Sequence, residues 1–162
     1  VRPSSVSAAR SSQIEVEKAA QERAVQGLDP DARKRAEDVA SRFAQAMNAR
    51  TWQTSRQQWR EALAPTVSPE LLKTLDVDRD WESDAQHRFV QARASTSVQV
   101  LEARAQTVQG ERVDVALMVA TETTGEDPWV TAPRTERPMT VVVDTTQNRV
   151  VAQIDMTPHG GL

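Results

Sequence analysis

Apolar residues recur every three or four positions in the first half of this chain and every second position in the second half. The first pattern is typical of helices that bury one face, and the second is typical of strands whose sheet is covered on one side. The period changes after the polar stretch Asp76–Ala85. Helices followed by strands predict an α+β domain, with the helices packed on one face of a curved antiparallel sheet.

The clearest helical pattern covers residues 29–50. Asp29 is the expected N-cap, and Pro30 suits the first helical position. One apolar stripe should face the core, namely Ala32, Ala36, Val39, Ala40, Phe43, Ala44 and Met47. Charged residues fill the other side, which we expect to be a solvated face: Arg33, Lys34, Arg35, Glu37 and Asp38.

The beginning of the chain is more polar. Ser12 and Glu15 have the spacing of a capping box, which predicts a helix that starts at Ser12 and stops at Gly27. We therefore expect residues 1–28 to form a flexible leader and a polar helix, a candidate stalk from a membrane anchor that is missing here. Residues 29–157 should form the α+β domain, and 158–162 a mobile tail.

Two tryptophans and a leucine-rich stretch follow in residues 49–75. Thr54 and Gln57 predict the capping box of a short helix, and Ser68 followed by Pro69 predicts the start of another. Aromatic residues at helical spacing are more often core than ligand pocket. The predicted core of this region joins the helices to the sheet and consists of Phe43, Trp52, Trp59, Leu63, Leu71, Leu72 and Leu75.

About four strands are expected in the second half, over residues 94–108, 111–124, 137–145 and 148–156. In the second of these, the apolar face that should be buried consists of Val113, Val115, Leu117 and Val119. Its opposite face is half-apolar and consists of Asp114, Ala116, Met118 and Ala120. The polar residues 121–137, which include Trp129, are expected to form a long loop.

Composition removes several classes of function. The net charge of −3 and the sequence pI of about 5.5 are a poor match to a phosphate backbone, so no direct nucleic-acid binding is expected. The chain has no cysteine, which excludes disulfides, thiol catalysis and cysteine-bound zinc. No apolar run approaches the ~20 residues of a membrane span.

Candidate chemistry is sparse. The chain has two histidines, His87 and His159, and His159 lies in a glycine-rich tail. Residues 76–87 begin like a calcium loop, but Trp81 and His87 stand where that loop needs glycine and glutamate. Asp114 would be a general base only if it faced an apolar cavity. We predict no catalytic residue, cofactor or metal, and an interaction surface that includes Trp129, Asp114 and Met118.

The run of residues 36–75, with its central Phe43, its Trp59, its Leu-x-Pro and its Ser-Pro-started leucine-rich helix, precedes a strand meander. Together these features resemble the extracytoplasmic nuclear-transport-factor-like domains of Gram-positive conjugation systems. Such domains are similar to the VirB-type bitopic assembly component of type IV secretion systems, the family that includes TcpC and TraM. The resemblance covers residues 32–156. The last hairpin lacks the Gly-x-Trp that many such domains carry there.

This resemblance implies a cone-shaped α+β fold and a non-enzymatic scaffold on the extracytoplasmic face of the membrane. The implied partners are other components of a membrane transfer complex, and self-association fits the same picture. The chain begins at Val1, so we expect an N-terminal anchor upstream. Two alternatives stay open: a small-molecule binder or lyase- or isomerase-type enzyme of the same fold, with Asp114, Met118, Trp59 and His87 as site candidates, and a Mce-associated envelope protein.

Overall fold

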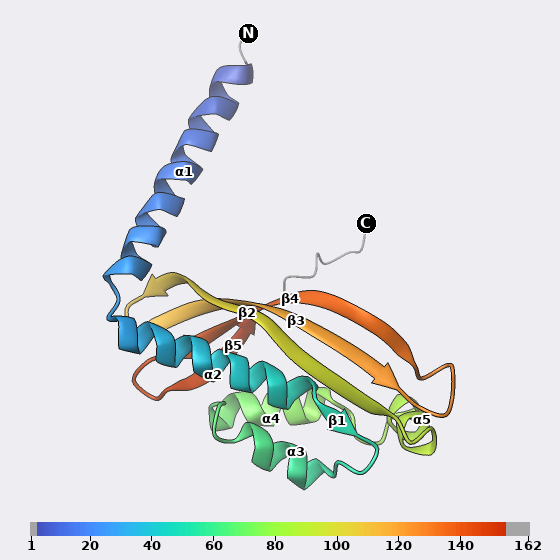
Figure 1. The fold of residues 1–162 in the computed structure, drawn as a ribbon. Helices are drawn as coiled ribbons and strands as arrows, with labels where there is room; N and C mark the ends of the chain where they lie inside the picture. The colour runs from blue at the N-terminus through green and yellow to red at the C-terminus, as the bar shows by residue number, and fades with distance from the viewer. Residues whose placement is uncertain (1–2, 155–162) are drawn as a thin grey trace.

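The computed structural model describes residues 3–154 of the chain, and its side chains from residue 12 onward. Five helices precede four of the five strands (Figure 1). The helices are α1 (Pro3–Gly27), α2 (Pro30–Asn48), α3 (Arg56–Leu63), α4 (Pro69–Asp78) and α5 (Asp84–Gln91). The strands are β1 (Arg50–Thr51), β2 (Ser95–Gln109), β3 (Arg112–Thr124), β4 (Ala132–Asp144) and β5 (Arg149–Ile154).

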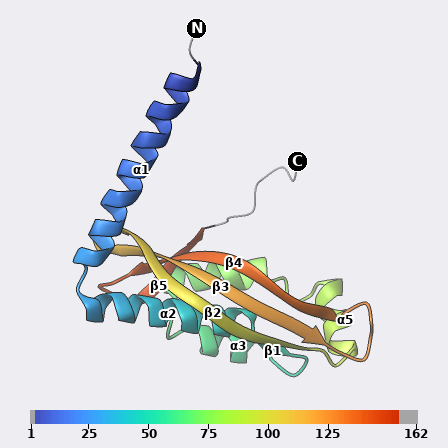
Figure 2. The ribbon, with the colours of Figure 1, turned by 45° about the horizontal axis from the view of Figure 1, so that its top comes forward.

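The strands form one antiparallel sheet in the order β1-β2-β3-β4-β5. Helices α2, α3 and α4 lie against one face of this curved sheet, while α1 projects away from the body (Figures 1 and 2). The predicted α+β arrangement is therefore confirmed. The sheet has one strand more than expected, because the two-residue β1 pairs with the start of β2.

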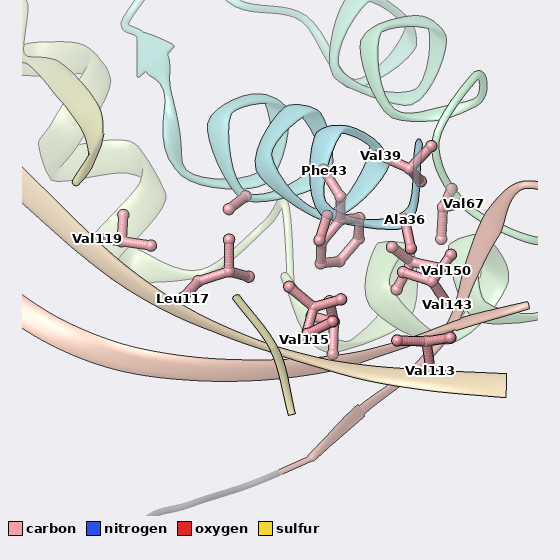
Figure 3. Packing of buried hydrophobic residues seen from close by; sticks show 14 of the residues in the cluster. Ala36, Val39, Phe43, Val67, Val113, Val115, Leu117, Val119, Val143 and Val150 are labelled. Atoms are coloured by element: carbon pink, nitrogen blue, oxygen red, sulfur yellow. The ribbon is translucent and has the colours of Figure 1, made fainter. Parts of the chain in front are cut away.

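The alternation of β3 explains the inner face of the sheet. Val113 pairs with Val143, and Val115 pairs with Val141, and all four side chains are fully buried. Successive side chains of a strand point to opposite faces, so this register places every second residue of β3 and β4 toward α2. Figure 3 shows Val113, Val115 and Val143 facing the helix, with Leu117 and Val119 farther along β3.

Helix α2 supplies the other half of the core. Its buried residues are Ala36, Val39, Ala40, Phe43 and Ala44, which is the predicted stripe without its two ends. Asp29 is the N-cap, although its side chain makes no capping hydrogen bond, and Pro30 begins the helix. Because the alanines are small, α2 can approach the sheet closely, and the fully buried ring of Phe43 fills the centre (Figure 3).

The free edge of β2 is covered by the first two helices. The Glu37 carboxylate accepts a hydrogen bond from the Ala105 N–H at 2.9 Å, and the Gln21 side chain accepts one from the Val108 N–H at 3.4 Å. These contacts satisfy backbone donors that an edge strand would otherwise expose. The charged side of α2 is therefore not wholly solvated as predicted, since Glu37 is half-buried and bonded to the sheet.

The segment before α4 protects the opposite edge. The Ser68 N–H donates to the Val150 carbonyl at 2.9 Å, and the Val150 N–H donates to the Thr66 carbonyl at 2.8 Å. These bonds fix β5 to the loop between α3 and α4. The Ser68 hydroxyl then caps α4, as its Ser-Pro start predicted. Both edges are thus closed where the sheet covers the core.

The starts of two helices differ from the sequence prediction. Helix α1 begins at Pro3, so it includes residues that we expected to belong to a flexible leader. The second capping box is formed by Ser55 and Gln58, one residue later than the predicted pair. The predicted mobile tail at 158–162 lies outside the described residues.

The predicted long loop over residues 121–137 is wrong. Strand β3 continues to Thr124 and β4 starts at Ala132, with Thr121 paired to Thr135 and Ala120 paired to Glu136. The backbone satisfies its hydrogen bonds in this ladder whatever the side chains are. Most of residues 121–137 therefore belong to a long hairpin, which the sequence pattern does not reveal because these residues are mostly polar.

Candidate functional site

The outer face of the sheet, opposite α2, is the first candidate surface. The register places on it Asp114, Ala116 and Met118 of β3, Pro138, Thr140 and Val142 of β4, and Ala152 and Ile154 of β5. Within the described residues no helix packs on this outer face of the strands. Helix α1 passes only the end of β2 (Figure 2). The predicted interaction residues Asp114 and Met118 lie here, half-buried. The face is a half-apolar surface that a partner could cover.

The tip of the β3–β4 hairpin is the second candidate surface. Trp129 is 93% exposed there, the largest exposed aromatic side chain of the described residues. The loop around it is internally bonded: the Trp129 N–H donates to the Asp127 carboxylate at 3.0 Å, and the Thr131 hydroxyl donates to the Pro128 carbonyl at 2.8 Å. A tryptophan held out by an ordered loop loses little entropy when a partner binds it.

A small apolar cluster fastens this loop to the body. Phe89 of α5 packs with Ala92, Ala94 and Val130, and the Glu126 N–H donates to the Ala92 carbonyl at 2.7 Å. Gly125 lies close against the segment Ala92–Ala94, because a Cβ placed on it would be 3.2 Å from both the Ala92 carbonyl oxygen and the Ala94 Cβ. The exposed Trp129 is therefore positioned by contacts of Gly125, Glu126 and Val130, one to four residues away.

The first half of β4 has a free edge. Strand β5 pairs with β4 only from Thr140 onward, so residues 132–139 have no partner on that side within the described residues. Pro133 and Pro138 lack N–H donors, and charged side chains lie between them. Prolines and charges discourage pairing with another strand. A partner is therefore better recognised by side chains at the tip than by strand addition.

Most of the residues predicted for the core are in it. Phe43, Trp59 and Leu63 are buried in the main cluster, and partly buried leucines pack against it, namely Leu71, Leu72 and Leu75. Trp52 differs from the prediction: it is half-buried, lies outside the core clusters, and carries the Arg93 guanidinium 5.5 Å from its ring centre. It follows the two-residue β1, where the chain turns away from the sheet.

Guanidinium groups and aromatic rings alternate at the end of the body formed by β1, α3, α4 and α5. We call Arg50, Trp59, Arg79, Trp81 and Phe89 the arginine–aromatic cluster. The Arg79 guanidinium lies 4.9 Å from the Trp59 ring centre and 4.3 Å from that of Trp81, and these two rings meet edge to face. The Arg50 guanidinium lies 3.9 Å from the Phe89 ring centre. Such cation–ring contacts are attractive, and more so when water is excluded.

The same region contains an ion pair between Arg56 and Asp76. Arg56 donates to both oxygens of Asp76, at 3.0 Å from Nε to Oδ1 and 2.6 Å from Nη2 to Oδ2, and the Trp81 indole donates to Oδ1 at 3.1 Å. Asp76 is buried, whereas the Arg56 side chain is 55% exposed. The hydrogen bonds from Arg56 lower the pKa of the Asp76 carboxyl against the opposing effect of burial.

The residues proposed for an enzyme do not converge. Asp114 and Met118 lie on the outer face, Trp59 is 3% exposed within the core, and His87 is exposed on α5. Within the described residues no group of three or more histidine, aspartate or glutamate side chains could hold a metal. A groove of about 970 Å³ lies between α1 and β2, lined by residues that include Ile14, Gln21 and Arg104. Its lining includes none of the four candidates.

Comparisons with known proteins add the fold relationship. No protein-family model and no curated protein sequence matches the chain. Among solved structures, it is similar to TraH of the Gram-positive conjugative plasmid pIP501, with a TM-score of 0.52 at 6% identity over 78% of this chain and 95% of TraH. It is also similar to CagV, a VirB8 homologue of the type IV secretion system of Helicobacter pylori strain 26695, with a TM-score of 0.55 at 10% identity over 75% of this chain and 95% of CagV.

These likenesses bear out the predicted resemblance at the level of architecture. Both similar chains are covered almost completely, and the matched part of this chain corresponds in size to the α+β body. Within the described residues no helix is long and apolar enough to cross a membrane. The chain therefore has the nuclear-transport-factor-like, VirB8-type fold, which it shares with a protein of a conjugative plasmid and a type IV secretion component.

Proposed function

We propose that this domain is a non-enzymatic assembly part of a conjugation or type IV secretion complex on the extracytoplasmic face of a membrane. It acts by contacts with other components of that complex. The observation that carries the proposal is Trp129, 93% exposed at the tip of an anchored hairpin. Tryptophan is the residue type most enriched among those that dominate binding energy at protein interfaces.

The fold relationship supports the class of complex. TraH comes from a conjugative plasmid, and CagV belongs to a type IV secretion system. The same fold also hosts enzymes, so the choice depends on the site and not on the fold. Here the candidate acid, base and pocket residues lie in different parts of the fold, whereas the most exposed aromatic side chain of the described residues, Trp129, lies at the hairpin tip.

Photo-crosslinking in the native cell tests the proposal. A benzoylphenylalanine placed at position 129 of the full-length protein should form adducts with other components of the transfer machinery, identified by mass spectrometry. The matched control position is Glu111, which is exposed in the turn at the other end of β3. Trp129→Ala should lower the frequency of plasmid transfer or of secretion while the protein level stays unchanged.

Three outcomes would count against the proposed assembly role. Identical adducts from positions 129 and 111 would mean that the hairpin tip has no special contact. Wild-type transfer by Trp129→Ala would mean that the contact has no function in transfer. Adducts with components of lipid transport would overturn the secretion assignment in favour of the Mce-associated alternative.

The outer face is the proposed site of weak self-association. Its apolar residues Met118, Val142 and Ile154 are half-buried or exposed, and symmetric copies of one patch can cover each other. Met118→Asp should shift the sedimentation equilibrium of the chain toward monomer, while Trp129→Ala should not. An unchanged equilibrium with Met118→Asp would remove the outer face as the dimer contact.

A further inference from the structure

The arginine–aromatic cluster has positive charge and no negative charge to balance it. Within the described residues, neither Arg50 nor Arg79 forms an ion pair with a carboxylate. Arg50 donates to a neutral acceptor, the Gln86 amide oxygen, at 3.1 Å. Burial, and secondarily the charge of Arg50, lowers the pKa of the Arg79 guanidinium to about 10. The two cations are thus close enough to repel each other.

The cluster also has two buried donors without an acceptor. Among the described residues, the indole Nε1 of Trp59 and the Nε of Arg79 are wholly buried and have no hydrogen-bond partner. Buried donors are nearly always bonded in native proteins, and an unbonded one needs an explanation. Both groups are N–H donors, so the missing group is an acceptor.

The neighbouring Arg56 shows what a purely structural arginine looks like in this fold. It is neutralised by two-pronged hydrogen bonds to the buried Asp76. Arg79 lies three residues beyond Asp76, and its sequence neighbours Asp78 and Asp80 are exposed and make no ion pair with it. Arg79 as a residue is half-buried, so part of it is accessible to solvent, whereas its Nε is wholly buried.

We infer that the arginine–aromatic cluster is a binding site for a carboxylate on an acidic segment of a partner protein. A guanidinium presents parallel N–H groups that match the two oxygens of a carboxylate. Arg79 is held rigidly between Trp59 and Trp81, and Arg50 is held by Phe89 and Gln86, so little side-chain entropy is lost on binding.

A protein carboxylate fits better than a nucleic acid. Proteins that bind single strands stack bases on open aromatic faces. Here Trp59 is 3% exposed, and guanidinium groups already cover the rings of Trp59, Trp81 and Phe89. This inference stands on the cluster geometry alone and does not depend on the proposed function.

Nuclear magnetic resonance on the ¹⁵N-labelled 162-residue chain tests the site, with a capped hexaglutamate peptide as the probe. The peptide should shift the Trp59 indole N–H and the Arg79 Nε–H resonances, while the exposed Trp129 indole stays in place. Arg79→Gln should weaken binding by at least about tenfold. Arg79→Lys keeps the positive charge but loses the parallel N–H donors of the guanidinium, and it should also weaken peptide binding.

The control variant is Arg134→Gln, since Arg134 is an exposed arginine outside the cluster that pairs with Glu136 on β4, and it should bind like the wild type. Arg50→Gln provides a second test if Arg79→Gln fails to fold. Peptide binding that neither cluster variant weakens would overturn the inference, as would the absence of any shift. An oligothymidylate that binds more tightly, with the same dependence on Arg79, would assign the site to nucleic acid instead. A water molecule detected at the Trp59 indole, with no response to the peptide, would make the donors structural.

Discussion

The two halves of the β3–β4 ladder have the same backbone pairing and opposite surroundings. In one half, Val113 and Val115 pair with Val143 and Val141, and none of these side chains is exposed. In the other half, Ala120 pairs with Glu136 and Thr121 with Thr135, and the β4 residues from Ala132 to Pro138 are exposed. We call these the covered half and the overhanging half.

The contrast separates what stabilises the fold from what is available to a partner. Backbone hydrogen bonds are formed in both halves, so they do not distinguish them. Apolar burial does, since it provides most of the free energy of folding and is concentrated under α2. Changes in the covered half should therefore alter stability, whereas changes in the overhanging half should alter binding.

The largest effect is expected from Phe43→Ala. The ring is fully buried between α2 and the valines of the sheet (Figure 3), and its removal leaves a cavity that the small neighbours cannot fill. The free energy of unfolding should fall by about 3–5 kcal/mol, as measured by urea denaturation. A loss below about 1 kcal/mol would mean that the covered half does not carry the stability.

A smaller effect is expected where α2 closes the edge of β2. Glu37→Ala removes the acceptor of the Ala105 N–H and should cost about 1–3 kcal/mol of unfolding free energy. Asp38→Ala is the matched control, because Asp38 is exposed on the same helix, and it should change stability by less than about 0.5 kcal/mol. Equal losses from the two variants would show that general charge effects on α2, and not the edge contact, are responsible.

A third change tests a pH dependence of the helical layer, through the ion pair between Arg56 of α3 and Asp76 of α4. The folded-state pKa of Asp76 is lowered by Arg56, so its ion pair stabilises the protein above the unfolded pKa of about 4 and is lost as the pH falls through the folded pKa. Asp76→Asn should lower the melting temperature by a few degrees at pH 7. The difference from the wild type should shrink in more acid buffers. A difference that stays constant into the acid range would contradict this assignment.

The smallest effect on stability is expected from Trp129→Ala in the overhanging half. The side chain is 93% exposed, so its loss should change the free energy of unfolding by less than about 0.5 kcal/mol. Crosslinking and transfer should nevertheless fall, as proposed above. A marked destabilisation would instead show that the tip supports the fold, and it would remove the contrast between the two halves.

The sequence predicts the covered half well. The alternation from Val113 to Val119 and the apolar stripe around Phe43 both indicate an element that is buried on one face. Such a pattern can be read from a short stretch of sequence. It does not predict α5, which is eight residues long and buries the single large side chain Phe89. It also fails for the overhanging half, where the β4 residues from Ala132 to Pro138 are exposed on both faces and no hydrophobic period exists.

The arginine–aromatic cluster could not be found in the same way. Arg50 is the first residue of β1, Trp59 belongs to α3, and Arg79 caps the end of α4. Their contacts depend on how three short elements meet in space, and no spacing along the chain encodes that meeting. The only signal is compositional, since Arg50 and Arg79 lie two residues before Trp52 and Trp81 respectively.

Gly125 sets a limit on how this protein can diverge. A methyl group at this position would press on the main chain of Ala92 and Ala94, and the backbone atoms there cannot move aside as a flexible side chain would. Related sequences should therefore vary freely at the tip residues that choose a partner, while the glycine at the base of the loop persists. Evolution could change what the hairpin recognises without changing where the hairpin stands.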